Sequence, residues 1–593
     1  MQRRSVLKGL AALAATPAIK PAIAARPFRR VRPGDFGWPD AREWQKLKTA
    51  LGDALIEVEP LFSPCIKEPH APACRAVQDN IRNPFFIGDQ AAGTQTSGWL
   101  DAWMSAPSVY AVKARTAADV VAALDFARAH NLRLTVKGGG HSYQGTSNAA
   151  DSLLIWTRTM NQITLHNAFV GQGCEGKITP RPAVSAGAGA MWIDLYHAVT
   201  TEAGRYVQGG GCTSVGVAGL VQSGGFGSFS KGFGTAASGL LEAEIVTADG
   251  RILVANACQN ADLFWALKGG GGGSWGVATR LTLRTHELPR FFGAAWGRVK
   301  ARSDAAFVNL LTHFFNFYAN NLLNPHWGEQ VAIAPDNSLK ISMVCQGLDA
   351  AEVQEVWRPF FDWATAQKDL EIVEPLGARA TEARHWWDVN GNPSMIADKR
   401  EGAPSYRGWW NGDGEQVGVF LHAYDSLWLP ASLLHEQDTQ TLVQALLAGS
   451  RYKTVGLHFN KGLAGASSDV LAATNQTATH PVVAEAFALA IIADGEAPAF
   501  PGEPRTPVDK RLARQDAQGV TNAATCLRKI VGNKGSYVSE SNYFNADWQT
   551  EYWGANYARL AKIKAKYDPA GLFTVHHGVG SEDWSEDGFT RRS

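Results

Sequence analysis

Two glycine-rich stretches each carry one side chain that can form a covalent bond. Val136-Lys-Gly-Gly-Gly-His141-Ser contains a histidine, and Gln208-Gly-Gly-Gly-Cys212-Thr-Ser-Val-Gly216 contains a cysteine. A thiol and an imidazole are nucleophiles, and each can become joined to an electrophilic cofactor. Glycine loses much backbone freedom on folding and buries no side chain, so a ligand that approaches the bare backbone explains this clustering.

The glycines also indicate which part of a ligand they would meet. Backbone N–H groups that no side chain obstructs can converge on an anion. A third run, Gly269 to Gly273, follows later in the chain. Neither of the first two runs is a Rossmann fingerprint or a Walker loop, and each alone could be a plain tight turn. Together the three runs favour a large ligand that carries a pyrophosphate.

Each nucleophile has an ordinary interpretation when it is taken alone. His141 could be a loop histidine with a hydrogen-bond partner, and Cys212 could be one half of a disulfide. Their matched settings, each on its own glycine loop, favour the functional interpretation of both residues.

The first residues of the chain predict an export signal. Arg3-Arg4 precedes the apolar run Leu10 to Ala15, and Ala22-Ile-Ala24 resembles a cleavage site. This order is typical of a twin-arginine leader, here residues 1–25, which implies a periplasmic or secreted protein and the twin-arginine export machinery as a partner. The apolar run is too short to be a membrane anchor.

Export to an oxidising compartment changes how the seven cysteines are interpreted. Cys65 and Cys74 are close in sequence and flanked by prolines, so we expect them to form a small disulfide loop. An odd number leaves at least one thiol over, and we expect that thiol to be Cys212. No Cys/His spacing typical of a metal site is present, and no metal is predicted. The pairing of four further cysteines stays open: Cys174, Cys258, Cys345 and Cys526.

Length and charge bound the architecture and the partners. A chain of 593 residues is too long for one ordinary core, so we expect two large domains. A net charge of +1 with 19% charged residues gives no basic surface for nucleic acid and no polybasic membrane patch. Small molecules are therefore the expected partners.

The elements around the first glycine loop can be predicted from the sequence pattern. Thr116-Ala-Ala-Asp119 is a capping box that begins a helix reaching Asn131, and Leu132 to Val136 alternates as a strand. His141 therefore follows the end of a strand, where binding loops are common. Further predictions in this region are a strand at 152–156, a helix at 191–203, a hairpin at 242–255, a short helix at 262–268 and a strand at 276–285.

After the predicted leader, the composition divides the chain into four parts. Residues 26–105 have many prolines and aromatics without a sustained period and predict an irregular extension. Residues 106–290 read as one α+β domain, residues 291–525 as a substrate domain, and residues 526–593 as a tail with a helix at 553–567. In the substrate domain we expect helices at 305–319, 351–366 and 431–448, and strands at 340–344, 416–423 and 454–459.

Four motifs together resemble a known family. They are the His141 loop, Cys212-Thr-Ser-Val-Gly216, Asp262-Leu-Phe-Trp-Ala-Leu-Lys with its glycines, and the late Tyr552-Trp-Gly-Ala-Asn-Tyr with Asp568-Pro569. The residues of these motifs and their order along the chain resemble those of the berberine bridge enzyme-like branch of the vanillyl-alcohol oxidase flavoproteins. The resemblance implies an α+β fold: a two-part PCMH-type FAD-binding domain at 106–290, and an α+β substrate domain whose antiparallel sheet is flanked by helices. The tail, 526–593, would return to the FAD domain.

The resemblance also implies the cofactor and its attachment. FAD would be linked through its 8α carbon to His141 and through C6 to Cys212, which makes the flavin bicovalent. The other residues expected to bind FAD are Lys137, Gly138, Gly139, Gly140, Ser142, Val215, Gly216, Gly219, Gly225 and Gly227. Gly139 and Ala218 depart from residues common in relatives, but both stay small.

A larger departure concerns the catalytic base. Relatives often have Tyr-x-Asn-Tyr near the C-terminus, whereas this chain has Tyr537-Val-Ser-Glu540. We expect Tyr537 to be the base, with Glu540 as the rival, and a structural tyrosine is the ordinary alternative. A phenol pKa near 10 would have to be lowered by positive charge, for which Lys461 and His458 are candidates.

Paired tryptophans could contact a substrate. His385-Trp386-Trp387 and Trp409-Trp410 could stack on sugar or aromatic rings, although twenty tryptophans fit a hydrophobic core as readily.

The predicted activity is hydride transfer from an alcohol, sugar or aromatic alcohol to the flavin, with O2 as acceptor and H2O2 as product. Two alternatives remain open. The first is a dehydrogenase that passes electrons to a quinone or cytochrome, and the second is a catalytically idle, flavin-loaded glycan-binding protein.

Overall fold

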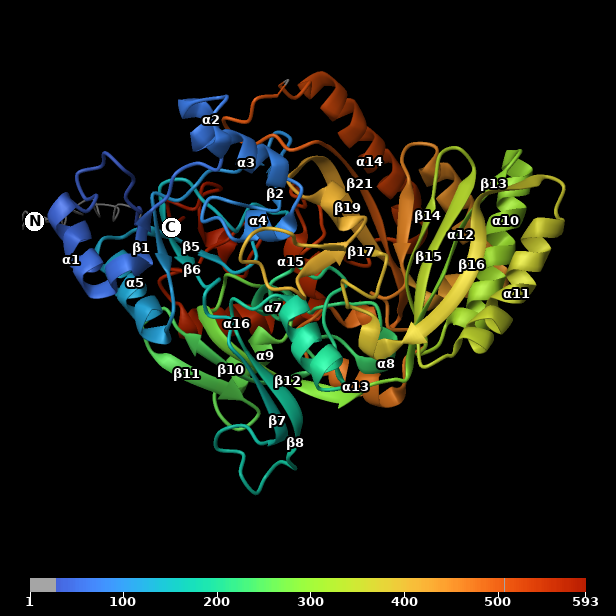
Figure 1. The fold of residues 1–593 in the computed structure, drawn as a ribbon, viewed down its shortest axis with the longest axis horizontal. Coiled ribbons are helices and arrows are strands. Elements are labelled where there is room, and N and C mark those ends of the chain that lie inside the picture. The colour runs from blue at the N-terminus through green and yellow to red at the C-terminus, as the bar shows by residue number, and fades with distance from the viewer. Residues whose placement is uncertain (1–27, 506, 593) are drawn as a thin grey trace, which may run out of the picture.

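The computed structural model describes residues 28–505 and 507–592, and these form two lobes (Figure 1). The predicted twin-arginine leader, residues 1–25, lies outside the described residues. One lobe holds two smaller sheets, and the other holds one large sheet covered by helices. The mixed α+β architecture agrees with the predicted fold class.

The first small sheet positions the His141 loop. It has the order β1 (Leu55–Glu57), β4 (Tyr110–Lys113), β6 (Ser152–Trp156) and β5 (Arg133–Lys137). The predicted capping box is present, because Thr116 accepts a hydrogen bond from the Asp119 N–H at the start of α5 (Ala117–Ala129). α5 buries Val120 and Leu124, and β5 and β6 pair in parallel. The helix and both strands predicted here are confirmed.

The second small sheet is antiparallel and carries the Cys212 side of the lobe. Its order is β11 (Ile252–Asn256), β10 (Leu240–Val246), β12 (Val277–Glu287), β8 (Arg181–Gly187) and β7 (Ile163–Phe169), with β9 (Arg205–Val207) on β12. The β10–β11 pair confirms the predicted hairpin. The predicted helix at 191–203 consists of α6 (Trp192–Tyr196) and a π-helical turn, His197–Glu202. A Cys174–Cys258 disulfide, left open by the sequence, ties the loop after β7 to the loop after β11.

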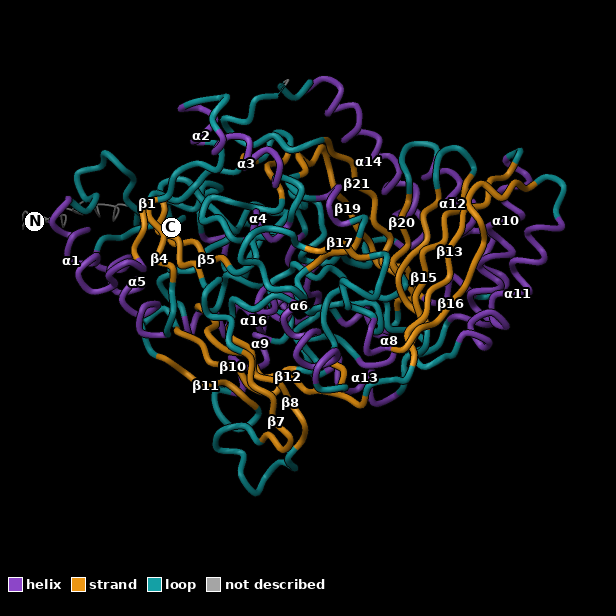
Figure 2. Tube along the Cα trace, in the orientation of Figure 1, coloured by secondary structure: helices purple, strands orange, loops and turns teal. Residues whose placement is uncertain are grey.

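The large sheet has nine strands, and all its pairings are antiparallel except the one between β19 and β2. Helices α10, α11, α12 and α14 share one core with the sheet and cover one of its faces (Figures 1 and 2). Within the described residues, no helix combines the length and the apolar character needed to cross a membrane. The strand order is β16 (Leu370–Glu382), β13 (Phe291–Ala301), β15 (Ser338–Gln346), β14 (Trp327–Ile333), β20 (Val455–His458), β21 (Ala486–Glu496), β19 (Val419–Pro430), β2 (Thr96–Trp99) and β3 (Trp103–Met104). The helices are α10 (Asp304–Phe317), α11 (Ala350–Ala366), α12 (Glu436–Ser450), α13 (Ser468–Asn475) and α14 (Lys510–Val531).

Residues 28–105 hold more regular structure than their sequence pattern predicts. They form α1 (Ala41–Leu51), α2 (Ser63–Lys67), α3 (Pro72–Asn80) and α4 (Pro84–Gly88), and the predicted Cys65–Cys74 disulfide joins α2 to α3. β1 belongs to a small sheet, whereas β2 and β3 belong to the large one. The segment therefore connects both lobes instead of wrapping one irregularly.

The C-terminal segment packs on the lobe that holds the two smaller sheets. α16 (Tyr557–Tyr567) contacts α9 (Ala261–Leu267), and the Lys564 ammonium donates to the carbonyl of Ser274 and to the Asp568 carboxylate. At the other end of the described chain, the Arg30 side chain, only 2% exposed, donates to the carbonyls of Gly571 and Gly588. The two ends of the described part of the chain are thus held together.

Candidate active site

A cavity of about 340 Å³ opens between the glycine loops of the lobe with the two smaller sheets and one end of the large sheet. All three glycine runs reach its wall. Residues 413–417, which precede β19, and residues of the C-terminal segment also line it. The main lining segments are 134–147, 212–223, 271–273, 413–417, 537–540 and 573–578, together with Lys461.

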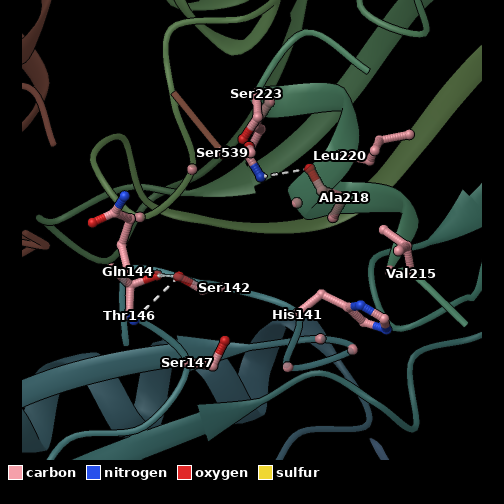
Figure 3. A pocket seen from close by; sticks show the side chains of 18 of the residues that line it. His141, Ser142, Gln144, Thr146, Ser147, Val215, Ala218, Leu220, Ser223 and Ser539 are labelled. Carbon is pink, nitrogen blue, oxygen red and sulfur yellow. Dashed lines mark hydrogen bonds between the residues drawn. The ribbon is translucent and has the colours of Figure 1, made fainter. Parts of the chain in front are cut away.

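His141 projects toward the second glycine loop from the loop that follows β5 (Figure 3). Its Nε2 and the Ser214 hydroxyl oxygen are 3.1 Å apart. Burial lowers the pKa of His141 to about 4, so the imidazole is neutral at pH 7. A neutral imidazole keeps a free electron pair on one ring nitrogen, which a nucleophile requires.

The two glycine loops approach each other so closely that side chains would not fit. A Cβ atom on Gly139 would lie 2.8 Å from the backbone nitrogen of Gly216, and a Cβ on Gly216 would lie 3.0 Å from that of Gly139. Gly140 also adopts φ = 77°, a conformation that favours glycine. The loops that carry His141 and Cys212 therefore face the same cavity, as the sequence predicts.

Cys212 lies half-buried at the cavity wall and is not in a disulfide. Its thiol donates to Asp413 Oδ1, at 3.6 Å. Burial raises the pKa of the Cys212 thiol well above its usual value, and the neighbouring Asp413 carboxylate adds to the effect. Cys345 and Cys526 are also unpaired, so the described chain has three free thiols.

The other predicted cofactor residues divide into two groups. Gly138, Ser142, Val215 and Gly219 line the cavity, as do the loop residues already described. Gly225 and Gly227 are not among the residues that line it; their lack of a side chain reflects close packing. A Cβ on Gly225 would lie 2.6 Å from the Ala236 Cβ.

Lys137 reaches the cavity wall, but its ammonium points into the protein. Its Nζ donates to the carbonyl of Gly93 at 3.0 Å, to that of Gln90 at 3.2 Å and to Asn148 Oδ1 at 3.2 Å. Burial lowers the pKa of Lys137 to about 7. Lys137 thus fastens the segment before β2 to the glycine loop.

The cavity walls fit FAD. Within the described residues, the N–H groups of Gly139, Gly140 and His141 form no backbone hydrogen bond and remain free for an anion. The side-chain carbonyl oxygens of Gln144 and Gln222, both on the cavity wall, are buried without a partner in the described chain. A ligand with a pyrophosphate and a polar ring edge could use these groups.

Tyr537 and Glu540 lie on one cavity segment, with Lys461 beside them. Glu540 forms an ion pair with Lys461, whose Nζ is 5.6 Å from the centre of the Tyr537 ring. The Tyr537 hydroxyl is buried and has no hydrogen-bond partner in good geometry among the described residues. It is therefore available to a ligand.

The expected lowering of the Tyr537 pKa is wrong. Burial raises this pKa well above the usual value for tyrosine, and the Glu540 carboxylate raises it further. Lys461 is engaged with Glu540. Burial also lowers the pKa of His458, which is then neutral and brings no positive charge. The role of Tyr537 as the base stays a prediction.

Two carboxyl groups near the cavity were not predicted. Asp413 begins the 3₁₀ turn Asp413–Gln416 before β19, and burial raises its pKa to about 6. Glu329 lies in β14 with φ = 64°, rare for a residue other than glycine, and accepts a hydrogen bond from the Ser228 hydroxyl. Burial raises the pKa of Glu329. Neither residue belongs to a motif or shows a periodic pattern, so only the three-dimensional arrangement reveals them.

The tryptophan pairs serve packing. Trp387 stacks on Tyr196 with ring centres 3.9 Å apart, and Trp409 is buried in β18 (Gly408–Trp410), which pairs with β17 (Met395–Ala397). The Trp410 indole donates to the carbonyl of Gly211, next to Cys212, at 3.0 Å. None of these tryptophans is among the residues that line the cavity. The core interpretation therefore describes them better than substrate stacking.

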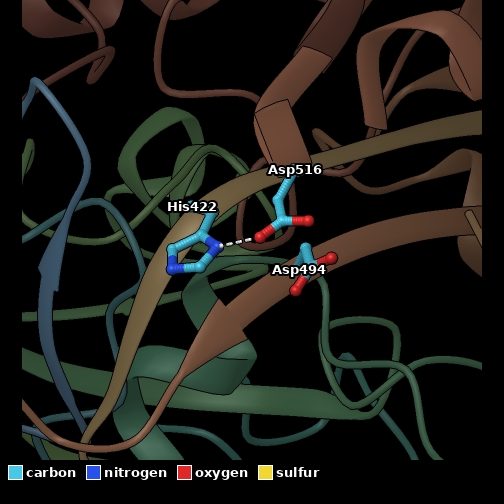
Figure 4. Close-up of side chains that lie close together, drawn as sticks. All are labelled: His422, Asp494 and Asp516. Atoms are coloured by element: carbon cyan, nitrogen blue, oxygen red, sulfur yellow. Dashed lines mark hydrogen bonds and ion pairs between the residues drawn. The ribbon is translucent and has the colours of Figure 1, made fainter. Parts of the chain in front are cut away.

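His422, Asp494 and Asp516 converge on one side of the large sheet, in an arrangement that could hold a metal ion (Figure 4). His422 Nδ1 lies 3.1 Å from Asp516 Oδ2. The Lys453 ammonium, however, forms ion pairs with both carboxylates. This lysine supplies the positive charge that the two carboxylates require, so the cluster is an ion-pair network.

Comparison with known proteins identifies the family. The FAD binding domain model matches residues 108–256, and the berberine and berberine-like model matches residues 534–580. A VAO-type flavoprotein oxidase of Thermothelomyces thermophilus is 30% identical over 589 residues, which cover 95% of this chain and 94% of the relative. The chain belongs to the VAO flavoprotein family. The resemblance to its berberine bridge enzyme-like branch is confirmed.

Further relatives agree with this assignment. An FAD-linked oxidoreductase of Gibberella zeae is 28% identical and covers 94% of each chain. The crystal structure of a VAO-type flavoprotein from Myceliophthora thermophila C1 has a TM-score of 0.76 at 24% identity, covering 95% of this chain and all of that one. A glucooligosaccharide oxidase from Acremonium strictum with a 6-S-cysteinyl, 8α-N1-histidyl FAD has a TM-score of 0.61 at 20% identity, covering 86% and 98%. This VAO-family member is accordingly an FAD-linked oxidoreductase with the predicted PCMH-type fold.

Proposed function

We propose that this VAO-family oxidoreductase holds FAD through covalent bonds to His141 and Cys212 and oxidises an alcohol or a carbohydrate hydroxyl. Dioxygen is the proposed acceptor, and hydrogen peroxide the product. The observation that carries the proposal is the placement of two nucleophiles, His141 and Cys212, on facing glycine loops at the wall of one cavity.

The chemical state of both side chains supports double attachment. Burial lowers the pKa of His141, so its imidazole is neutral, and Cys212 is a free thiol although four other cysteines are in disulfides. The oxidase from Acremonium strictum, similar in fold, has a flavin joined to one histidine and one cysteine. We infer the same pair of bonds here.

A hydroxyl substrate fits the part of the cavity that is lined by Tyr537, Glu540 and Lys461. Oxidising an alcohol requires removal of the hydroxyl proton as hydride leaves the carbon. The bound flavin would accept that hydride. Tyr537 presents a buried hydroxyl that has no hydrogen bond in good geometry among the described residues, and its phenolate form is the proposed acceptor of the substrate proton; Glu540 is the rival. Chitooligosaccharide oxidase and a carbohydrate oxidase from Microdochium nivale are similar in fold, which supports a sugar hydroxyl as substrate.

Export in the folded state completes the proposal. The leader sequence at residues 1–25 motivates a periplasmic or secreted location. The two disulfides, Cys65–Cys74 and Cys174–Cys258, support it, since such bonds persist in oxidising compartments.

Acid precipitation tests the attachment. The pellet of the wild-type protein should remain yellow, as should those of His141→Ala and Cys212→Ala, because one bond suffices to retain the flavin. The double variant should give a colourless pellet. A colourless wild-type pellet would refute covalent attachment.

Substrate screening tests the reaction. Oligosaccharides and aromatic alcohols are added to the holoprotein while flavin absorbance and hydrogen peroxide are recorded. Bleaching with peroxide formation in air supports an oxidase. Bleaching that is reversed only by a quinone or a dye would identify a dehydrogenase instead. Tight glycan binding with no bleaching would indicate a binding protein.

A further inference from the structure

Asp413 is the carboxylate that contacts the Cys212 thiol. The Cys212 Sγ donates to Asp413 Oδ1, at 3.6 Å, and both residues line the cavity. The second carboxylate oxygen, Asp413 Oδ2, is buried and forms no hydrogen bond in good geometry within the described chain. Cys212 is thus the hydrogen-bond donor that this side chain engages from another part of the chain, 201 residues away.

The other ionisable groups near the thiol are already engaged. Glu329 accepts a hydrogen bond from Ser228, and Glu540 forms an ion pair with Lys461. His141 lies on the facing loop, with its Nε2 near the Ser214 hydroxyl, and is itself a proposed flavin ligand. Asp413 alone among these groups is in hydrogen-bonding contact with Sγ.

We propose that Asp413 is the general base that deprotonates Cys212 when the cysteine becomes attached to the flavin. This inference rests on the proposed double attachment. Burial and the neighbouring carboxylates raise the pKa of the thiol, so a thiolate will not form by simple ionisation at neutral pH. A base in contact with the sulfur removes that obstacle. The pKa of Asp413, raised to about 6, makes it a stronger base than an ordinary aspartate.

The atoms and electrons of the step balance with dioxygen as oxidant. Asp413 takes the S–H proton, and the thiolate sulfur forms a bond to ring carbon C6. The hydrogen on C6 leaves as a proton, and two electrons pass into the ring system. Dioxygen removes these two electrons with two protons as hydrogen peroxide. The net change is one S–H and one C–H bond replaced by one S–C bond, while one O2 becomes one H2O2.

Attachment would also change what Asp413 can bind. Once the sulfur is a thioether it carries no proton, and the carboxylate loses its Cys212 donor. Oδ1 of Asp413 then has no Cys212 donor, and Oδ2 has no hydrogen bond in good geometry even before attachment. The Oδ1 atom of Asp413 thereby becomes available to a substrate hydroxyl only after the flavin has been joined.

Counting free thiols in the denatured holoprotein tests the proposal without an activity assay. A maleimide mass tag is added in denaturant without reductant, so that the disulfides stay closed. The wild-type protein should show only Cys345 and Cys526 as free thiols. Asp413→Asn should also label Cys212, because loss of a general base slows proton transfer by about 10² to 10⁴-fold. The Asp413→Asn pellet should stay yellow through His141, which also shows that the variant folds.

Matched variants distinguish the base from its surroundings. Asp413→Glu restores a carboxylate and should return the labelling toward the wild-type pattern. Glu415→Gln, an exposed acid in the same turn, should leave it unchanged. Glu329→Gln removes a nearby half-buried acid that does not hydrogen-bond to the thiol and should also leave Cys212 unlabelled. If Asp413→Asn gives no flavin-loaded protein, Asp413→Ser also removes the carboxylate and leaves a smaller side chain.

The outcomes separate this inference from the function on which it rests. Labelling of Cys212 in the wild-type holoprotein would overturn the double attachment and the role of Asp413 together. Protection of Cys212 in the wild type and equally in Asp413→Asn or Asp413→Ser would overturn the role of Asp413 alone. Labelling of Cys212 in Glu329→Gln as strong as in Asp413→Asn would also overturn it. The combined negative charge near the thiol, and not proton transfer to Asp413, would then explain the labelling.

Discussion

The ammonium group of Lys461 forms an ion pair with the Glu540 carboxylate beside the buried phenol of Tyr537. Burial of the phenol raises its pKa, the Glu540 carboxylate raises it further, and the Lys461 cation is paired with that carboxylate. The protonation of Tyr537 therefore depends on keeping both members of the pair, which can be tested by removing one charge at a time.

Tyr537→Phe removes the proposed acceptor of the substrate proton. The rate of flavin bleaching by a substrate should fall by about 10² to 10⁴-fold, the usual contribution of a general base. Stopped-flow absorbance measures this rate, and the flavin content of the acid pellet should not change. Tyr143→Phe, at a half-buried tyrosine of the same cavity, should have a much smaller effect. If a substrate bleached the flavin of the Tyr537→Phe variant at the wild-type rate, Tyr537 would be excluded as the base.

Single charge removals should move the pH profile of bleaching in opposite directions. Glu540→Gln removes a negative charge that raises the Tyr537 pKa, so the rising limb of the profile should shift to lower pH. Lys461→Met removes the cation near the ring and should shift the limb to higher pH. If Glu540 is the base, Glu540→Gln will instead abolish the limb.

The two disulfides should differ in their contribution to stability. Cys174–Cys258 closes a loop of 84 residues, and Cys65–Cys74 closes one of 9. In the chain-entropy description these loops correspond to about 4.6 and about 2.6 kcal/mol. Replacing both cysteines of the longer loop by serine should therefore lower the urea midpoint more than the same change in the shorter loop. Equal shifts would contradict this ranking.

His480 should contribute to loss of stability in acid. Burial lowers its pKa to about 4, and its Nδ1 accepts a hydrogen bond from the Val482 N–H. Between pH 6.5 and 4 the unfolded chain takes up a proton that the native state does not, so stability falls as the pH falls. At pH 5 the loss from this residue is up to about 2 kcal/mol.

His480→Asn keeps a side-chain acceptor for Val482 but cannot titrate, and it serves as the comparison. The difference in urea midpoint between pH 7.5 and pH 5 should be smaller in this variant than in the wild type. The same difference in both proteins would show that His480 is not one of the acid-sensitive groups.

The glycine loops and their neighbouring elements were predictable because their signals are local. A capping box fixes the start of α5, and the strand at 152–156 was predicted with the bounds it has as β6. Errors appear where a single residue breaks a periodic pattern. The helix expected from Trp553 begins at Tyr557, because Gly554 adopts φ = 52° and ends α15 (Trp548–Trp553). The helix expected at 431–448 begins at Glu436, after a 3₁₀ turn and an extended His435.

The unpredicted part of the site depends on contacts between distant segments. Asp413 and Cys212 are 201 residues apart, and no motif or periodic pattern near either residue predicts that they are in contact. The raised pKa of Tyr537 arises from burial by several elements, which a motif cannot convey. The same holds for residues 28–105, whose short strands acquire their partners only from sheets formed by later parts of the chain.

Arg30 links the order of synthesis to the order of folding. Its guanidinium is enclosed by carbonyl groups of Gly571, Leu572 and Gly588, more than 540 positions later in the chain. While the ribosome is still making the middle of the protein, this cation has no acceptors and must stay in water. The first lobe can therefore close only after translation is almost finished, and a chain truncated before residue 571 would leave a buried charge without compensation.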